Sequence, residues 1–182
     1  EKVNTLINHI QAYLYQKREW NPRWENAFTP ALCNRIDRNT GGIVIAAKNA
    51  ETLRIINDKI RDHELTKRYL CITLGAPRPP AGEVENFLRK DEKKKQVFVF
   101  HKPVPGAKTA VTRYKTLQRR GELALVEVEL LTGRTHQIRA TMADLGCPLL
   151  GDGKYGNGEK NRSYGETRQA LYSYKLTFDL PT

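Results

Sequence analysis

The sequence predicts an α+β fold, a mixed and mainly antiparallel sheet with a few flanking helices. Segments with the period of a β-strand follow one another in runs, and only a few segments show the apolar spacing of a helix. The 182 residues, 39% of them hydrophobic and 28% charged, suffice for one globular domain with a sizeable core. No apolar run approaches the roughly 20 residues that a membrane span needs, so we expect no membrane partner.

Two segments of the amino-terminal half have a helical apolar face. In residues 3–17 that face runs from Val3 to Leu14, and in the second segment Asn49 can cap a helix. Between them, an apolar run follows two glycines, which is typical of a buried strand. The predicted order is a helix over 3–17, an irregular segment over 18–34, a strand over 43–47, a helix over 49–60 and a strand over 68–74.

The carboxyl-terminal half is richer in strands. Residues 75–95 are rich in proline and predict turns that end in a charged hairpin tip. Residues 122–131 alternate, with Ala124, Val126 and Val128 on one side. The other predicted elements are strands over 96–100, 110–117 and 170–180, a helix over 135–145 that stops at Gly146, and a glycine- and lysine-rich loop over 151–167.

The charge balance favours a polyanionic partner. The chain has 31 Lys and Arg against 20 Asp and Glu, a formal net charge of +11, and nucleic acid is the commonest soluble polyanion. A generally basic protein without such a partner is the alternative. The three cysteines are scattered without a CxxC pair, which indicates a reducing, cytoplasmic location and neither a zinc site nor a disulfide framework.

Asp37 is a candidate catalytic carboxylate. It lies between Arg35 and Arg38, shortly before the glycine pair Gly41 and Gly42. Glycines permit a close approach of the backbone, and turn amides and flanking cations can hold a carboxylate ionised. An ordinary turn aspartate beside a strand is the alternative interpretation.

A basic turn from Gly133 to Arg139 is the second candidate segment. It leads a strand into a helix, whose amino terminus favours anions, and Arg134 and Arg139 could each meet a carboxylate or a phosphate. A solvated basic helix start is the alternative. The other histidines show no ligand spacing with His136, so we expect it to be a structural or hydrogen-bonding residue and no metal to bind.

Tyr69 is a candidate for stacking on a nucleic-acid base. Lys67 points to the same face of its predicted strand, and cations beside an aromatic ring suit a base flanked by phosphates. A tyrosine packed at the sheet edge is the alternative. The charged run from Arg89 to Lys95 could also contact RNA, although such runs are usually only solvated.

Four motifs in order give the chain a resemblance to the RluA family of pseudouridine synthases. From about Phe28 to Phe178, the segments NRIDRNTGG, KRY, GRTHQIR and PLLGDGKYG are similar to the family's HRLDxxTSG, KxY, GRTHQIR and PxxGDxxYG. The first segment departs from the pattern in carrying Asn34 for histidine and a glycine for serine. The resemblance implies the pseudouridine synthase catalytic fold and no cofactor.

The resemblance also implies a role for each matching residue. Asp37 would be the nucleophile, and Arg139 would pair with its carboxylate and aim it. Tyr69 would stack on the target uracil and assist proton removal at C5, and Ile138 would pack against that uracil. Arg35 would hold the place of the flipped-out base in the RNA.

The resemblance implies that residues 1–182 are a catalytic domain. Because the chain begins at Glu1 without the family's upstream strands, we expect it to be N-terminally incomplete. The predicted function is conversion of uridine to pseudouridine in structured RNA, above all 23S ribosomal RNA, by a monomeric enzyme. Transfer RNA is the alternative substrate, and a non-catalytic RNA-binding or ribosome-assembly factor is the alternative class.

Overall fold

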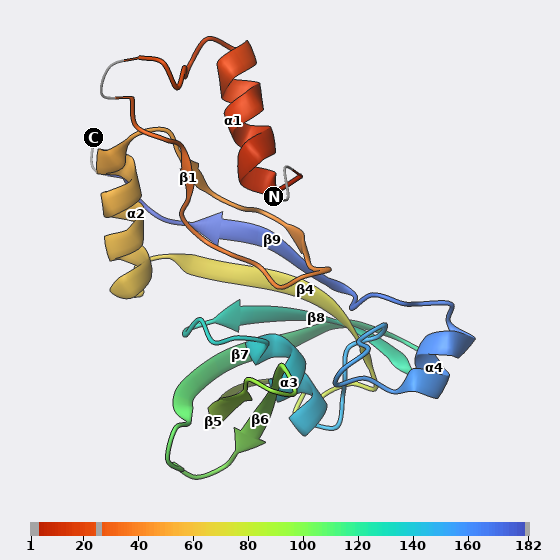
Figure 1. The fold of residues 1–182 in the computed structure, drawn as a ribbon. Helices are drawn as coiled ribbons and strands as arrows, with labels where there is room; N and C mark the ends of the chain where they lie inside the picture. Colours follow the sequence, from red (N-terminus) through yellow and green to blue (C-terminus); the bar gives the residue numbers. More distant parts are fainter. Residues whose placement is uncertain (1–3, 25–26, 181–182) are drawn as a thin grey trace. The chain divides into compact units, whose positions relative to one another are not determined.

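A seven-stranded sheet organises most of the chain in the computed structural model, which describes residues 4–24 and 27–180 (Figure 1). Neighbouring strands pair antiparallel except for the parallel pair of β2 and β9, which confirms the mixed, mainly antiparallel sheet. The strands lie in the order β2 (Gly41–Gly42), β9 (Leu171–Thr177), β4 (Thr66–Leu74), β8 (Leu123–Leu130), β7 (Lys108–Arg120), β5 (Ala81–Asp91) and β6 (Gln96–Phe100).

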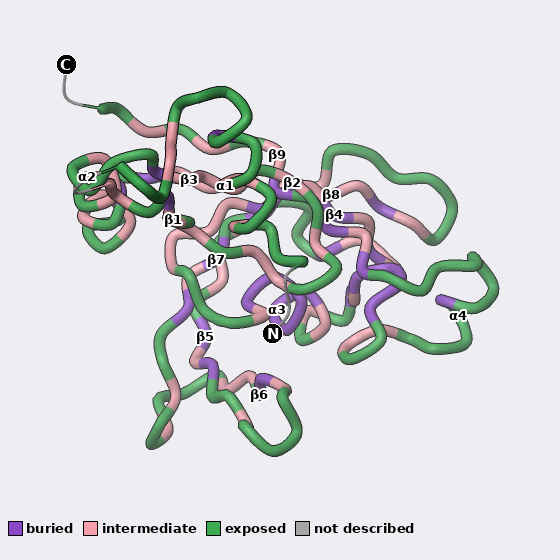
Figure 2. Tube along the Cα trace, turned by 45° about the horizontal axis from the view of Figure 1, so that its top comes forward, coloured by how far each residue is buried: buried purple, intermediate pink, exposed green. Residues whose placement is uncertain are grey.

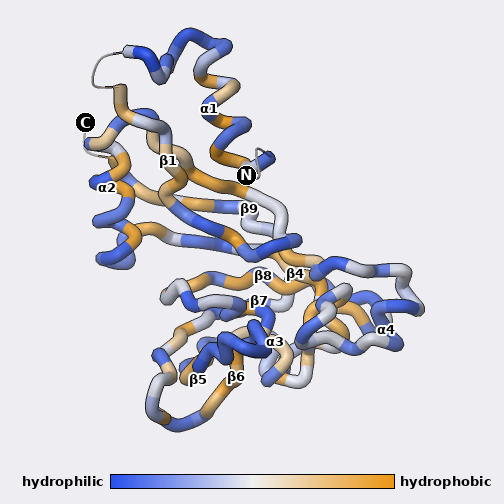
Figure 3. Tube along the Cα trace, in the orientation of Figure 1, coloured by the Kyte–Doolittle hydropathy of each residue, from blue (hydrophilic) through white to orange (hydrophobic). Residues whose placement is uncertain are grey.

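The alternating sequence of β8 accounts for the centre of this sheet. Ala124, Val126 and Val128 are buried, and the residues between them point to the other face. Hydrophobic residues recur along β4 and β8 in Figure 3, whereas the segment around α4 (Gly158–Ser163) is mostly hydrophilic. Burial of one face therefore fixes the register in which β8 pairs with β4 and β7.

Helix α3 (Gln137–Asp144) is buried over most of its length, as Figure 2 shows. Met142 is completely buried, and Ala140 joins a core cluster with Leu88 of β5 and Val97 of β6. Gly146 ends the helix with a positive φ of 75°. Because α3 contains the last three residues of the basic turn, this packing fixes the position of their side chains.

The described residues form two compact units. Unit 1 holds the described residues up to Ile36, Val44–Leu65 and those from Phe178 onward, and unit 2 holds Asp37–Ile43 and Thr66–Thr177. Unit 1 contains helices α1 (Leu6–Gln16) and α2 (Ala50–Arg61) and the antiparallel strands β1 (Ala31–Leu32) and β3 (Ala46–Ala47). Asn49 caps α2 as expected by accepting a hydrogen bond from the amide of Thr52, while Val3 of the predicted first helix lies outside the described residues.

The predicted strand over residues 43–47 is wrong. Only the last two residues of the run form a strand, β3 (Ala46–Ala47), residues 43–45 are not in a strand, and Ile43 is 40% exposed. The preceding strand β2 belongs to a different sheet and ends at Gly42, whose φ is +118°, where the backbone turns away from a regular strand. The apolar run is therefore shared by the two units and does not form one buried strand.

The turn-rich interpretation of residues 75–95 is also wrong for its central part, which forms the long strand β5. Its pairing with both β6 and β7 supplies the hydrogen bonds that a turn would have made. The hairpin tip itself is present, because the Asp91 carboxylate accepts the amides of Lys93 and Lys94. Within the predicted loop over 151–167, the sequence reasoning missed α4.

The glycine at position 42 should be essential for the edge of the sheet. A Cβ there would lie 2.2 Å from the carbonyl oxygen of Ser173, and the positive φ would be strained for any other residue. We therefore expect Gly42→Ala to lower the free energy of unfolding by about 1–3 kcal/mol. Urea denaturation measures this change.

Gly153→Ala is the matched control, since no atom lies within 4 Å of its Cβ position. We expect it to change the free energy of unfolding by less than about 0.5 kcal/mol. Equal stability of the two variants would show that the close approach of β2 to β9 is not a constraint.

Candidate active site

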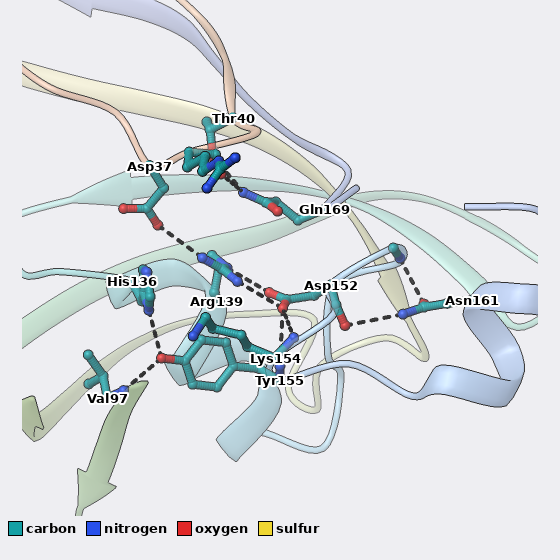
Figure 4. Close-up of polar contacts among 12 residues, drawn as sticks. Asp37, Thr40, Val97, His136, Arg139, Asp152, Lys154, Tyr155, Asn161 and Gln169 are labelled. Atoms are coloured by element: carbon teal, nitrogen blue, oxygen red, sulfur yellow. Dashed lines mark hydrogen bonds and ion pairs between the residues drawn. The ribbon is translucent and has the colours of Figure 1, made fainter. Parts of the chain in front are cut away.

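Asp37 lies in a tight turn at the edge of the sheet, in the segment that leads into β2. The amide of Thr40 donates to the carbonyl of Asp37 at 3.0 Å, and Asn39 between them has a positive φ of 66°. From the segment before β9, the Gln169 side-chain amide donates to the Arg38 carbonyl at 2.6 Å and to the Thr40 hydroxyl at 3.2 Å (Figure 4). The turn is therefore held by a side chain from the far end of the sequence.

Arg139 of α3 lies between two carboxylates. Its Nη1 is 3.7 Å from Oδ2 of Asp37, which is ion-pair distance without a hydrogen bond. Its Nε and Nη2 donate to Asp152 at 2.7 and 3.0 Å. The side chain of Arg139 is 7% exposed and that of Asp37 is 22% exposed, so the pair is partly open to solvent on the aspartate side. The expected proximity of Arg139 and Asp37 is present, but the shorter contacts go to Asp152.

Asp152 is a buried carboxylate that sequence reasoning left without a role. Burial raises its pKa, but the hydrogen bonds from Arg139 and from the amides of Lys154 and Tyr155 outweigh this, so the pKa is below its usual range. Burial likewise opposes the charge of Arg139, and the hydrogen bond to Asp152 more than offsets it, so the pKa of Arg139 is raised. The signal in the sequence that could have indicated a role for Asp152 was its place in the GDGKYG stretch.

His136 and Tyr155 form a second polar pair beside Arg139. The Tyr155 hydroxyl accepts the amide of Val97 at 2.8 Å and lies 2.8 Å from Nδ1 of His136. Burial lowers the pKa of His136, which favours the neutral form of the ring. His136 is a hydrogen-bonding residue as expected.

The basic turn is anchored by Gln137, which is buried. Its side-chain oxygen accepts the Thr132 hydroxyl and the amide of Arg134, and its side-chain nitrogen donates to Val111 and Thr112 of β7. Arg134 itself donates to a backbone carbonyl of β7, at Thr109, rather than to a carboxylate. Of the two arginines in the GRTHQIR segment, Arg134 is therefore bonded to β7, whereas Arg139 is directed at Asp37.

Tyr69 of β4 is 7% exposed and lies opposite Val128 of β8. Burial raises the pKa of its hydroxyl, a contact with Ser173 opposes this, and the charge of Asp37 adds to the rise. Lys67, two residues earlier on β4, is half-buried, which lowers its pKa. Its Nζ lies 3.4 Å from the position of a Cβ at Gly133, which places a cation beside the basic turn.

The negative charge of Asp37 favours the protonated form of four groups from three different segments, although burial still lowers the pKa of His136: they are Tyr69, His136, Arg139 and Tyr155. The structure therefore brings together Asp37, Tyr69 and Arg139 of the predicted site residues. Ile138 precedes Arg139 on α3 and is 4% exposed, and Arg35 is exposed and belongs to unit 1. The roles expected for all five residues stay predictions.

Residues 4–24 and 27–180 bring no three His, Cys, Asp or Glu side chains together as a metal site. None of the helices described there has the length and apolar character to span a bilayer.

The sequence is similar to RNA-modifying proteins over most of its length. The family model described as RNA pseudouridylate synthase matches residues 7–144. The ribosomal large subunit pseudouridine synthase D of Borreliella burgdorferi is 34% identical over 178 residues, which cover 98% of this chain and 52% of that protein. The RNA pseudouridine synthase YlyB of Bacillus subtilis is 31% identical over 179 residues, which cover 98% of this chain and 56% of that protein.

Solved structures show the same fold. Human RNA pseudouridylate synthase domain containing 4 superposes with a TM-score of 0.75 at 23% identity, and the match covers 97% of this chain and 76% of that one. The chain spans about half the length of the curated relatives it matches. With the family model and the four motifs in agreement, the chain belongs to the RNA pseudouridylate synthase family and is of the RluA type.

Proposed function

We propose that this chain is the catalytic part of an enzyme that converts uridine to pseudouridine in RNA, with Asp37 as the nucleophile. The observation that carries the proposal is the position of Asp37, partly open to solvent and 3.7 Å from a buried guanidinium nitrogen of Arg139. A protein that only binds RNA has no use for a carboxylate in a basic site. Membership of the synthase family supplies the reaction that this arrangement suits.

The reaction requires the target uracil to leave its stack. Its N1–C1′ bond must break and a C5–C1′ bond must form, and neither atom is accessible within a helix, so the nucleotide flips into a pocket at a cost of a few kcal/mol. Stacking on Tyr69 would return about 1–3 kcal/mol of this cost.

The carboxylate of Asp37 would then be the reacting group. Attack at the ribose C1′, addition to the uracil C6 and removal of a sugar proton all assign the chemistry to the same carboxylate. Arg139 holds positive charge beside it. The hydrogen at C5 leaves to solvent when the new bond has formed, and Tyr69 would assist that step.

Large-subunit ribosomal RNA is the substrate that we propose. A relative that is 34% identical across nearly the whole chain is named a ribosomal large subunit pseudouridine synthase, and the net charge of +11 suits a large structured RNA. Transfer RNA is the second candidate. A cytoplasmic location and a monomeric state stay predictions.

Asp37→Asn should stop the reaction without unfolding the protein. The amide has the same shape but is a poor nucleophile, so release of tritium from RNA labelled at uridine C5 should fall below detection. RNA affinity, measured by filter binding, should stay within a few-fold of the wild type because the phosphate contacts are unchanged.

Asp58→Asn makes the same chemical change at an exposed ion pair with Arg61 on α2 and is the control. It should leave the rate of tritium release unchanged, since exposed pairs contribute little. Release that survives Asp37→Asn would remove the nucleophile assignment. Salt-sensitive RNA binding with no release by the wild type would favour the non-catalytic binding factor instead.

Substitution of Tyr69 should separate stacking from proton transfer. Tyr69→Leu removes the ring and should raise KM about 5- to 150-fold, which corresponds to the loss of about 1–3 kcal/mol of stacking. Tyr69→Phe keeps the ring, so its KM should match the wild type, and its kcat should fall if the hydroxyl assists at C5. Steady-state kinetics on a ribosomal RNA fragment measures both constants, and an unchanged KM in the Leu variant would contradict the stacking role.

A further inference from the structure

The guanidinium of Arg139 uses its nitrogens unequally. Asp152 binds it side-on through Nε and Nη2, so Nη1 is the nitrogen left facing Asp37. A guanidinium is planar and its donors have a fixed geometry. Once two of its nitrogens are held, the direction of the third is determined.

Asp152 is itself held from several sides. Besides Arg139, its Oδ1 accepts the amides of Lys154 at 2.8 Å and Tyr155 at 3.1 Å. Its carbonyl accepts the side-chain amide of Asn161 at 3.1 Å and the amide of Gly156 at 3.0 Å. A side chain that is 0% exposed and bonded in this way has one available position (Figure 4).

The ring of Tyr155 bounds Arg139 on a third side. The guanidinium carbon lies 5.2 Å from the centre of the ring, within cation–π distance. The ring is fixed in turn by the bonds of its hydroxyl to Val97 and His136. The guanidinium is therefore held between a carboxylate and an aromatic face, both from the loop after α3.

We infer that Asp152 is a positioning residue, which acts through Arg139 to direct Nη1 at the carboxylate of Asp37. The inference rests on the proposed function, because it assigns Asp152 to the same reaction. A buried ion pair is by itself weak evidence for stability, since the loss of hydration can exceed the attraction. The side-on geometry indicates a different role for the pair, which is to orient the guanidinium that lies beside the carboxylate of Asp37.

Steady-state kinetics of Asp152→Asn tests this role. The amide cannot accept two hydrogen bonds from the same guanidinium edge, so Nη1 loses its direction. We expect kcat for tritium release to fall about 100-fold, as for a displacement of about 1 Å of a catalytic group, with KM unchanged. Glu122→Gln, which removes the carboxylate from the exposed pair with Lys160, is the matched control and should keep the wild-type kcat.

A double-mutant cycle distinguishes positioning from a separate structural role. If Asp152 acts only through Arg139, the variant with both Asp152→Asn and Arg139→Gln should be no slower than Arg139→Gln alone, within about twofold. Losses that multiply would overturn the inference. If Asp152→Asn does not fold because it leaves a buried charge unpaired, Asp152→Glu retains the pair but shifts the carboxylate. A wild-type kcat in that variant would equally overturn the inference.

A measurement without turnover separates this inference from the proposed function. The Nε–H hydrogen of Arg139 should exchange slowly with solvent in proton–nitrogen NMR spectra of the wild type, and at least tenfold faster in Asp152→Asn. Unchanged exchange would mean that Asp152 does not hold Arg139. Absence of tritium release from the wild type would instead refute the proposed function, whatever the exchange rates show.

Discussion

The ion pair between Arg139 and Asp152 is the contact on which the rest of the site depends. Both side chains are buried, so each charge would be unstable without the other, and their hydrogen bonds leave one guanidinium nitrogen for Asp37. Through this pair, the loop after α3 determines the charge beside the candidate nucleophile. A single buried cation thus connects two carboxylates, that of Asp152, which is buried, and that of Asp37, which is partly open to solvent.

The sheet makes this arrangement possible by bringing distant segments together. Asp37 precedes β2 at one edge, Tyr69 lies on β4, and Arg139 follows β8 on a buried helix. Gln169, just before β9, bonds to the turn that carries Asp37. Since β9 lies between β2 and β4, this order of strands brings the turn close to the tyrosine. A candidate site whose residues come from separate segments requires such a framework.

Local sequence patterns predicted the elements whose stability is local or whose burial is one-sided. Asn49 capped its helix and β8 alternated as expected, because a cap is made within one turn and alternation follows from one buried face. The strand β5 was mistaken for turns because prolines dominate the segment before it, while its pairing is made by β6 and β7. The apolar run after Gly42 was split for the same reason, since its partners lie elsewhere in the chain.

The order of the four motifs by itself determined the family resemblance, the candidate nucleophile and the cationic and aromatic residues near it. Only the tertiary structure decided how these residues are bonded. Arg139 could be expected near Asp37, but its two short bonds go to Asp152, and His136 bonds to Tyr155. A motif records which residue types are present, whereas the choice between carboxylates depends on distances that packing sets. The bonds between Arg139 and Asp152 therefore depend on how the loop after α3 folds against that helix.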